Sequence, residues 1–122
     1  MEFSISAKDM QLFGALSGDY NPLHVDDTFA KSKGFEGVVV YGALIAAKIS
    51  QLIGMRLPGR DGIWCSFSLQ FCAPLYVGET AQAEGLISAV SDSTGMVELA
   101  LTIRNKDRLL AKGKAEVLLV AQ

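Results

Sequence analysis

The second half of the chain alternates between apolar and polar positions in the way that strands do. From residue 63 onward the period is two, and one face is apolar: Ile63, Cys65, Phe67, Leu69 and Phe71. Such a period is typical of a strand that buries one face. The alternation continues over residues 80–90, 96–104 and 109–120, with short polar turns at 91–95 and 105–107. The pattern therefore predicts an antiparallel sheet of long strands.

The first half of the chain follows a helical period instead. Ser6 is a good N-cap for a helix that runs to about Leu16 and ends at Gly18. Its expected apolar stripe is Met10, Leu12, Phe13 and Leu16. Residues 18–24 predict a fixed loop, because Pro22 lacks an amide hydrogen and pushes Asn21 toward an extended conformation. A short helical turn at about 26–33 is expected to end at Gly34.

Residues 43–55 predict a second kind of helix, because their apolar side chains cover nearly the whole circumference. A helix that is hydrophobic on all sides is buried. One buried helix followed by long antiparallel strands predicts an α+β fold in which the sheet wraps around the helix. The periodicity by itself goes no further than this class.

Composition narrows the classes of partner. The chain has 122 residues, enough for one core, and half of them are hydrophobic. The mean hydropathy of +0.30 predicts apolar surface that association would cover, as in a homodimer or higher homo-oligomer. The net charge of −2 and the scattered basic residues argue against a nucleic-acid partner, so none is expected. No leader or long apolar span is present, so we expect a cytoplasmic protein with no membrane partner.

Cysteine usage agrees with a reducing compartment. Cys65 and Cys72 are expected on one strand, on opposite faces and too far apart to form a disulfide. Their spacing matches no metal-ligand pattern, so no metal site is predicted.

Candidate chemistry is concentrated in residues 17–24, which hold Asp19, the turn residue Pro22 and the only histidine of the chain, His24. An aspartate and a histidine held near one water can supply the proton donor and acceptor of acid–base catalysis. The alternative is structural, with Asp19 in a turn or cap and His24 at the surface. The residues alone leave both interpretations open.

The segment SGDYNPLHVDDTFAKSKGFEGVVVYG, residues 17–42, resembles the hydratase motif of the MaoC-like, R-specific enoyl-CoA hydratase family. The resemblance extends through the helix at 43–55, the FCAPL segment at 71–75, the VGE segment at 77–79 and the later strands. It therefore covers nearly the whole chain and implies a single MaoC-like hot-dog domain over residues 1–122, with an antiparallel sheet wrapped around a central helix.

The resemblance also implies a reaction and a set of roles. Asp19 and His24 would share a water that adds across the 2,3 double bond of an enoyl thioester, giving the R-3-hydroxyacyl product, or would catalyse the reverse dehydration. Gly42 would bind the thioester oxygen at the start of the buried helix. Asn21 would orient the loop, and Ser50 would hydrogen-bond the catalytic acid or, equally, its own helix. The family commonly has His where this chain has Tyr41, which is expected to change the pocket wall and the acyl preference.

The leading hypothesis is therefore an acyl-thioester hydratase or dehydratase that needs no metal or redox cofactor. Its substrate would be carried by coenzyme A or an acyl carrier protein. One rival is a non-catalytic acyl-binding or assembly subunit, which predicts a blocked or misaligned Asp19–His24 pair. Another is a hot-dog thioesterase, which would release a free thiol. No phosphate loop, metal-ligand cluster or nucleophile elbow is found in the sequence.

Overall fold

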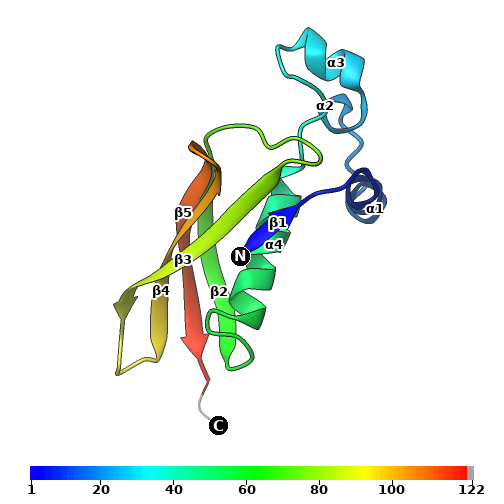
Figure 1. The fold of residues 1–122 in the computed structure, drawn as a ribbon. Helices are drawn as coiled ribbons and strands as arrows, with labels where there is room; N and C mark the ends of the chain where they lie inside the picture. The colour runs from blue at the N-terminus through cyan, green and yellow to red at the C-terminus, as the bar shows by residue number, and fades with distance from the viewer. Residues whose placement is uncertain (121–122) are drawn as a thin grey trace.

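The computed structural model describes residues 1–120 and contains one antiparallel sheet with a long helix along one face (Figure 1). The elements in chain order are β1 (Glu2–Ser4), α1 (Ala7–Ser17), α2 (Pro22–Val25), α3 (Asp27–Ser32), α4 (Gly42–Met55), β2 (Gly62–Phe71), β3 (Thr80–Val90), β4 (Met96–Asn105) and β5 (Arg108–Leu119). The strand order is β1-β3-β4-β5-β2. The predicted α+β class and hot-dog arrangement are confirmed, whereas the short strand β1 was not predicted.

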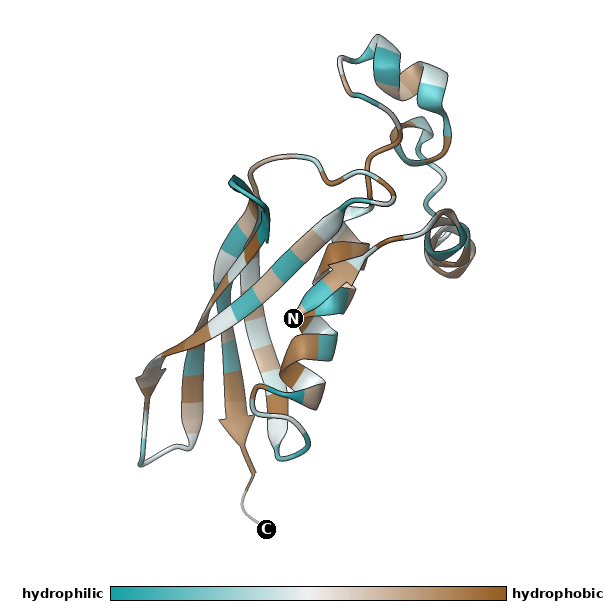
Figure 2. Ribbon diagram, in the orientation of Figure 1, coloured by the Kyte–Doolittle hydropathy of each residue, from teal (hydrophilic) through white to brown (hydrophobic). Residues whose placement is uncertain are grey.

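Helix α4 packs on the sheet through one side only. Its buried side chains are Ile45, Ile49, Leu52 and Ile53, which join the sheet's inner residues in one hydrophobic cluster. Figure 2 shows the apolar colour along most of this helix. The expectation that α4 is buried all round is wrong for this chain by itself, because Ala47 is exposed and Met55 is 75% exposed. A single curled sheet covers only part of a helix, so the opposite side of α4 stays open.

Helix α1 has the predicted bounds but not the predicted stripe. Ser6 is the N-cap and forms a capping box with Asp9, and Gly18 ends the helix with a φ of 76°. The stripe is wrong at Leu12 and Leu16, which are 60% and 85% exposed. Figure 1 shows α1 projecting away from the sheet together with α2 and α3, so that much of its surface does not face the sheet.

A bulge in β2 changes which of its residues face inward. The pairing of β2 with β5 shifts between Trp64 and Ser66, and the extra residue is Cys65. Trp64 therefore packs against the core, and Ile63 is 53% exposed. The expected buried face is wrong at Ile63 and Cys65, because the bulge reverses the alternation, and Phe67 and Phe71 of that face are also about half exposed. Cys72 lies one residue beyond the strand, and both cysteines are free and exposed.

Candidate active site

A short helix, rather than the predicted loop, positions the histidine. Pro22 occupies the first position of α2, where the missing amide hydrogen of proline costs nothing. The Asn21 carboxamide caps this helix by accepting a hydrogen bond from the Leu23 amide at 2.9 Å. Asp19 Oδ1 in turn accepts from the Asn21 amide at 3.0 Å. His24 is thereby held in a helical turn whose start is fixed by two successive side-chain caps.

The His24 imidazole is held by a hydrogen bond at one ring nitrogen and by stacking on one face. Its Nδ1 lies 2.6 Å from the carbonyl oxygen of Val39. Because a carbonyl oxygen only accepts, Nδ1 carries the hydrogen, and Nε2 of the neutral ring is left as a proton acceptor. The ring also stacks on Tyr41, with 4.2 Å between centroids and 27° between planes. This arrangement leaves one imidazole nitrogen available for acid–base chemistry.

Tyr41 connects the histidine to the acid. It is 2% exposed, and its hydroxyl donates a hydrogen bond to the backbone carbonyl of Asp19 at 2.6 Å. Burial raises the pKa of the Tyr41 hydroxyl above its ordinary value, and the neighbouring Asp19 and Tyr20 raise it further. The hydroxyl therefore remains a donor at neutral pH.

Gly42, the first residue of α4, lines the same cavity as His24. This cavity has a volume of about 340 Å³ and is also lined by Phe35, Phe71 and Pro74. A Cβ on Gly42 would lie 2.8 Å from Cζ of Phe71, so the absence of a side chain lets this ring lie against the start of the helix.

The start of α4 also presents hydrogen-bond donors. Tyr41, the N-cap, makes no side-chain cap bond. Within residues 1–120 the amides of Gly42 and Ala43 donate to no acceptor. The first amides of a helix carry the positive end of its dipole, so they can bind an anionic oxygen.

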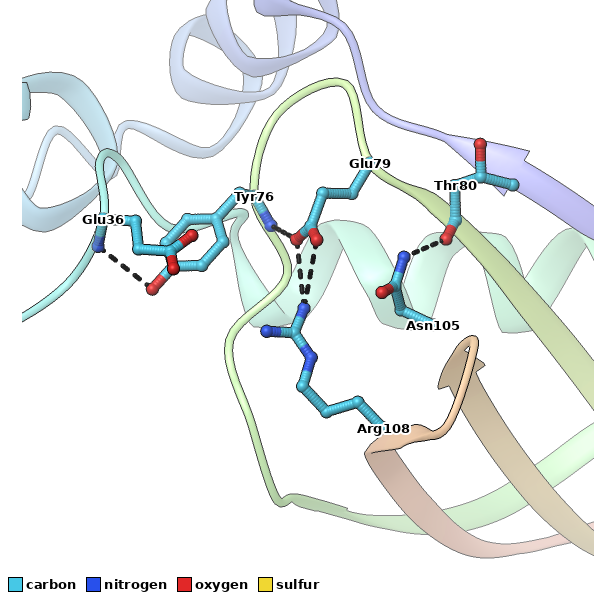
Figure 3. Close-up of polar contacts among 6 residues, drawn as sticks. All are labelled: Glu36, Tyr76, Glu79, Thr80, Asn105 and Arg108. Carbon is cyan, nitrogen blue, oxygen red and sulfur yellow. Dashed lines mark hydrogen bonds and ion pairs between the residues drawn. The ribbon is translucent and has the colours of Figure 1, made fainter.

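A larger cavity of about 820 Å³ is lined by His24 and Tyr41, together with residues of α1 and the loops at 36–38 and 76–77. Figure 3 shows how the two loops are joined, since the Tyr76 hydroxyl accepts a hydrogen bond from the Glu36 amide. Glu79 accepts from the Tyr76 amide and pairs with Arg108 at 3.1 Å. These contacts hold the two cavity-lining loops against each other and against the start of β5.

The structure brings some of the predicted residues together and leaves others apart. His24 and Gly42 share a cavity, whereas Asp19 is exposed and lines neither cavity. In the described part of the chain no hydrogen bond joins the Asp19 and His24 side chains, and none joins Ser50 to Asp19. Ser50 is exposed on α4.

The sequence predicts only that Tyr41 shapes the pocket wall, and it does not predict the contacts of Tyr41 with Asp19 and His24. One feature of the sequence points to such contacts. A tyrosine directly before a buried helix is a poor side-chain cap, so its hydroxyl is expected to bond elsewhere.

Neither a metal-binding cluster nor a membrane-spanning helix is present in residues 1–120. No group of three His, Cys, Asp or Glu side chains is placed to bind a metal ion. None of the helices in this part of the chain is long and apolar enough to cross a membrane.

Comparison with known proteins gives consistent matches along the chain. The family model described as MaoC like domain matches residues 1–107. An (R)-specific enoyl-CoA hydratase of Aeromonas caviae is 38% identical over 86% of this chain and 78% of its own length. A protein of the same name from Rhodospirillum rubrum is 33% identical, over 98% of this chain and 83% of its own. The solved structure of an (R)-hydratase from A. caviae, involved in PHA biosynthesis, matches with a TM-score of 0.92 at 35% identity, over 98% of this chain and 91% of that one.

Proposed function

The chain belongs to the MaoC-like family and is a hydro-lyase, and from this premise we propose that it hydrates 2-enoyl thioesters with R specificity or dehydrates the 3-hydroxyacyl products. One observation carries the proposal at the level of the site. His24, with Nε2 as a free acceptor, and Gly42, with an amide that donates to no acceptor in residues 1–120, line one cavity. A proton acceptor and an oxyanion donor are what addition of water to an enoyl thioester requires.

In the proposed reaction, Asp19 and His24 hold one water molecule over C3 of the substrate. One of the two groups takes a proton from the water as the water oxygen bonds to C3. The C2–C3 π bond breaks in the same addition, and a proton is delivered to C2 on the same face. The negative charge that develops on the thioester oxygen meets the amide of Gly42 at the start of α4. Because the two groups exchange protons with one water, they act as a coupled pair.

The proposal extends to the surroundings of this pair. Asn21 supports the pair by capping α2. Ser50 makes no hydrogen bond to Asp19 within residues 1–120, so the proposal gives it no part in the reaction. Addition of water transfers no electrons, so the reaction needs no redox cofactor, and coenzyme A or an acyl carrier protein carries the acyl group. The free cysteines support a cytoplasmic location.

The proposal is tested by hydration of crotonyl-CoA and of a longer enoyl-CoA, with the configuration of the product resolved. Asp19→Asn and His24→Ala are each expected to lower kcat by about 10²- to 10⁴-fold, the usual contribution of a positioned acid or base. Asp92→Asn is the matched control, because Asp92 lies in the exposed β3–β4 turn. An S product, or full activity in both site variants while folded, would overturn the assignment.

A second candidate is a non-catalytic acyl-binding subunit. It is favoured by one observation, namely that Asp19 lies outside the cavity that His24 and Gly42 share. This candidate predicts that the chain binds an acyl thioester without converting it. Binding without turnover, with both CoA and acyl-carrier-protein substrates, would support it. Release of a free thiol would indicate a thioesterase instead.

A further inference from the structure

Tyr41 occupies a position from which one side chain contacts both the His24 ring and the backbone of Asp19. Its backbone is the N-cap of α4, and its side chain is almost fully buried. Since the side chain does not cap the helix, its placement serves contacts elsewhere. Those contacts are with the Asp19 backbone and the His24 ring.

The ring of Tyr41 is confined between two others. Phe13 of α1 lies 4.9 Å from it, centroid to centroid, at 50°, and His24 of α2 lies 4.2 Å away in a stacked arrangement. Offset and tilted aromatic contacts of this kind restrict ring orientation. The Tyr41 ring therefore packs between α1 and the His24 imidazole, and its backbone belongs to the start of α4, so the orientation of the imidazole depends on both helices.

The hydroxyl end is equally confined. It donates to the Asp19 carbonyl, and α1 approaches it closely at Gly14, where a Cβ would lie only 3.0 Å from the Tyr41 oxygen. Residue 14 therefore has to be small for the hydroxyl to keep its place. The hydrogen bond spans 22 positions of sequence and ties the segment before α2 to the start of α4.

We propose that Tyr41 is a positioning residue for the hydration reaction, holding the Asp19 backbone through its hydroxyl and the His24 ring through its aromatic face. This inference rests on the proposed function. Tyr41 itself exchanges no proton with the substrate. It holds the His24 ring and the Asp19 backbone in place relative to Gly42, whose amide starts the same helix.

The test compares kcat and KM for crotonyl-CoA in the wild type, Tyr41→Phe and Gly14→Ala. Tyr41→Phe keeps the stacked ring and removes the hydroxyl bond, so kcat is expected to fall about 10- to 100-fold while KM stays within about threefold. Gly14→Ala leaves Tyr41 intact, crowds its hydroxyl and should lower kcat in the same way. Asn105→Ala is the matched control, because its carboxamide also donates to a backbone carbonyl, that of Thr80, outside the site (Figure 3).

A spectroscopic readout separates positioning from stability. His24 is the only histidine in the chain, so its Cε1–H and Cδ2–H proton resonances report this ring alone. Tyr41→Leu removes the stacked ring and is expected to shift both resonances downfield, whereas Tyr41→Phe should broaden or shift them by loosening the ring's support. Asn105→Ala should leave them unchanged, whatever its effect on the melting temperature.

The outcomes distinguish the two proposals. Wild-type turnover with unchanged kcat and unchanged His24 resonances in Tyr41→Phe would overturn the positioning role and leave the hydratase function intact. Absence of wild-type turnover on every thioester would count against the function. In that case the His24 resonances alone decide whether Tyr41 positions the ring.

Discussion

At the scale of single residues, Gly42 combines two properties that usually have separate explanations. Its missing side chain lets the Phe71 ring lie where a Cβ would be, and its amide begins α4 without an acceptor in the described residues. If Gly42 served packing alone, an added methyl group would only push the half-exposed Phe71 ring outward and activity would be kept. If Gly42 also binds the thioester, the methyl group should lower activity.

Gly42→Ala is therefore expected to fold and to lose activity. The methyl group displaces the ring of Phe71 and intrudes on the cavity shared with His24, so kcat/KM should fall about 10- to 100-fold. Gly54→Ala is the control in the same helix, because a Cβ there meets nothing within 4 Å. Steady-state kinetics and thermal unfolding of both variants provide the measurement.

Adding Phe71→Ala to Gly42→Ala then separates the two causes. If the displaced ring is what blocks the cavity, the double variant regains activity. If the methyl group itself keeps the thioester from the helix amide, the double variant remains impaired. Full activity in Gly42→Ala would remove the thioester-binding role from this position.

Contacts between residues close in sequence could be predicted, whereas contacts between residues far apart in sequence could not. Asp19, Asn21 and His24 lie within six positions, so local turn chemistry and a motif resemblance are enough to select them. The bond between Tyr41 and Asp19 spans 22 positions, and the contact between Gly42 and Phe71 spans 29. The first contact depends on how the segment before α2 packs on the start of α4, and the second on how β2 passes that helix. A pattern of residues along the chain does not specify either arrangement.

At the scale of elements, the starts and ends of helices were predicted better than the faces of strands. The Ser6 cap and the Gly18 end of α1 are local signals, and the structure has both. The inward face of β2 depends on the bulge at Cys65, which is set by pairing with β5 rather than by β2 alone. Strand β1 has three residues and too short an alternation to detect, yet it completes one edge of the sheet.

The capping box of α1 gives the protein an acid-sensitive contribution to stability. Hydrogen bonds from the Ser6 backbone and side chain lower the pKa of Asp9 below its ordinary value. A carboxylate with a lowered pKa stabilises the fold above the unfolded-state pKa, near 3.8, and the contribution is lost as pH falls through the folded-state pKa.

The free energy of unfolding of wild type should therefore exceed that of Asp9→Asn near neutral pH, and the difference should shrink below about pH 4. Urea unfolding followed by circular dichroism between pH 3 and pH 7 measures it. Ser6→Ala removes the partner hydroxyl and should cost about 1 kcal/mol at pH 7. Asp92→Asn serves as the control. A difference between wild type and Asp9→Asn that is independent of pH would contradict the role of the Asp9 charge.

At the scale of the whole molecule, the flank formed by strand β2 and the open side of α4 is apolar and uncovered in the described residues. Strand β2 is the last strand of the sheet, so one side of its backbone pairs with no other strand among residues 1–120. Its side chains Ile63, Phe67 and Phe71 are 53%, 46% and 52% exposed. The open side of α4 adds exposed Ala43 and Ala47. An apolar edge strand of this length is normally covered.

We expect a second copy of the chain to cover this flank, because the mean hydropathy is positive and an unpaired edge can pair with its own copy across a two-fold axis. Phe67→Asp places a charge on β2 and should prevent the association expected at this flank, leaving monomers in sedimentation velocity at micromolar concentration. Leu86→Asp is the matched control, since Leu86 is 70% exposed on β3, toward the other edge of the sheet.

Each result assigns the flank to one occupant. A dimer that is lost in Phe67→Asp and kept in Leu86→Asp places the interface on β2. The reverse places it at the end of the sheet formed by β1 and β3 and leaves β2 for a different partner. If Phe67→Asp is monomeric and also inactive while His24 keeps its resonances, the second copy supports catalysis next to the cavity that contains Phe71. A wild type that is monomeric at every concentration would contradict the dimer outright.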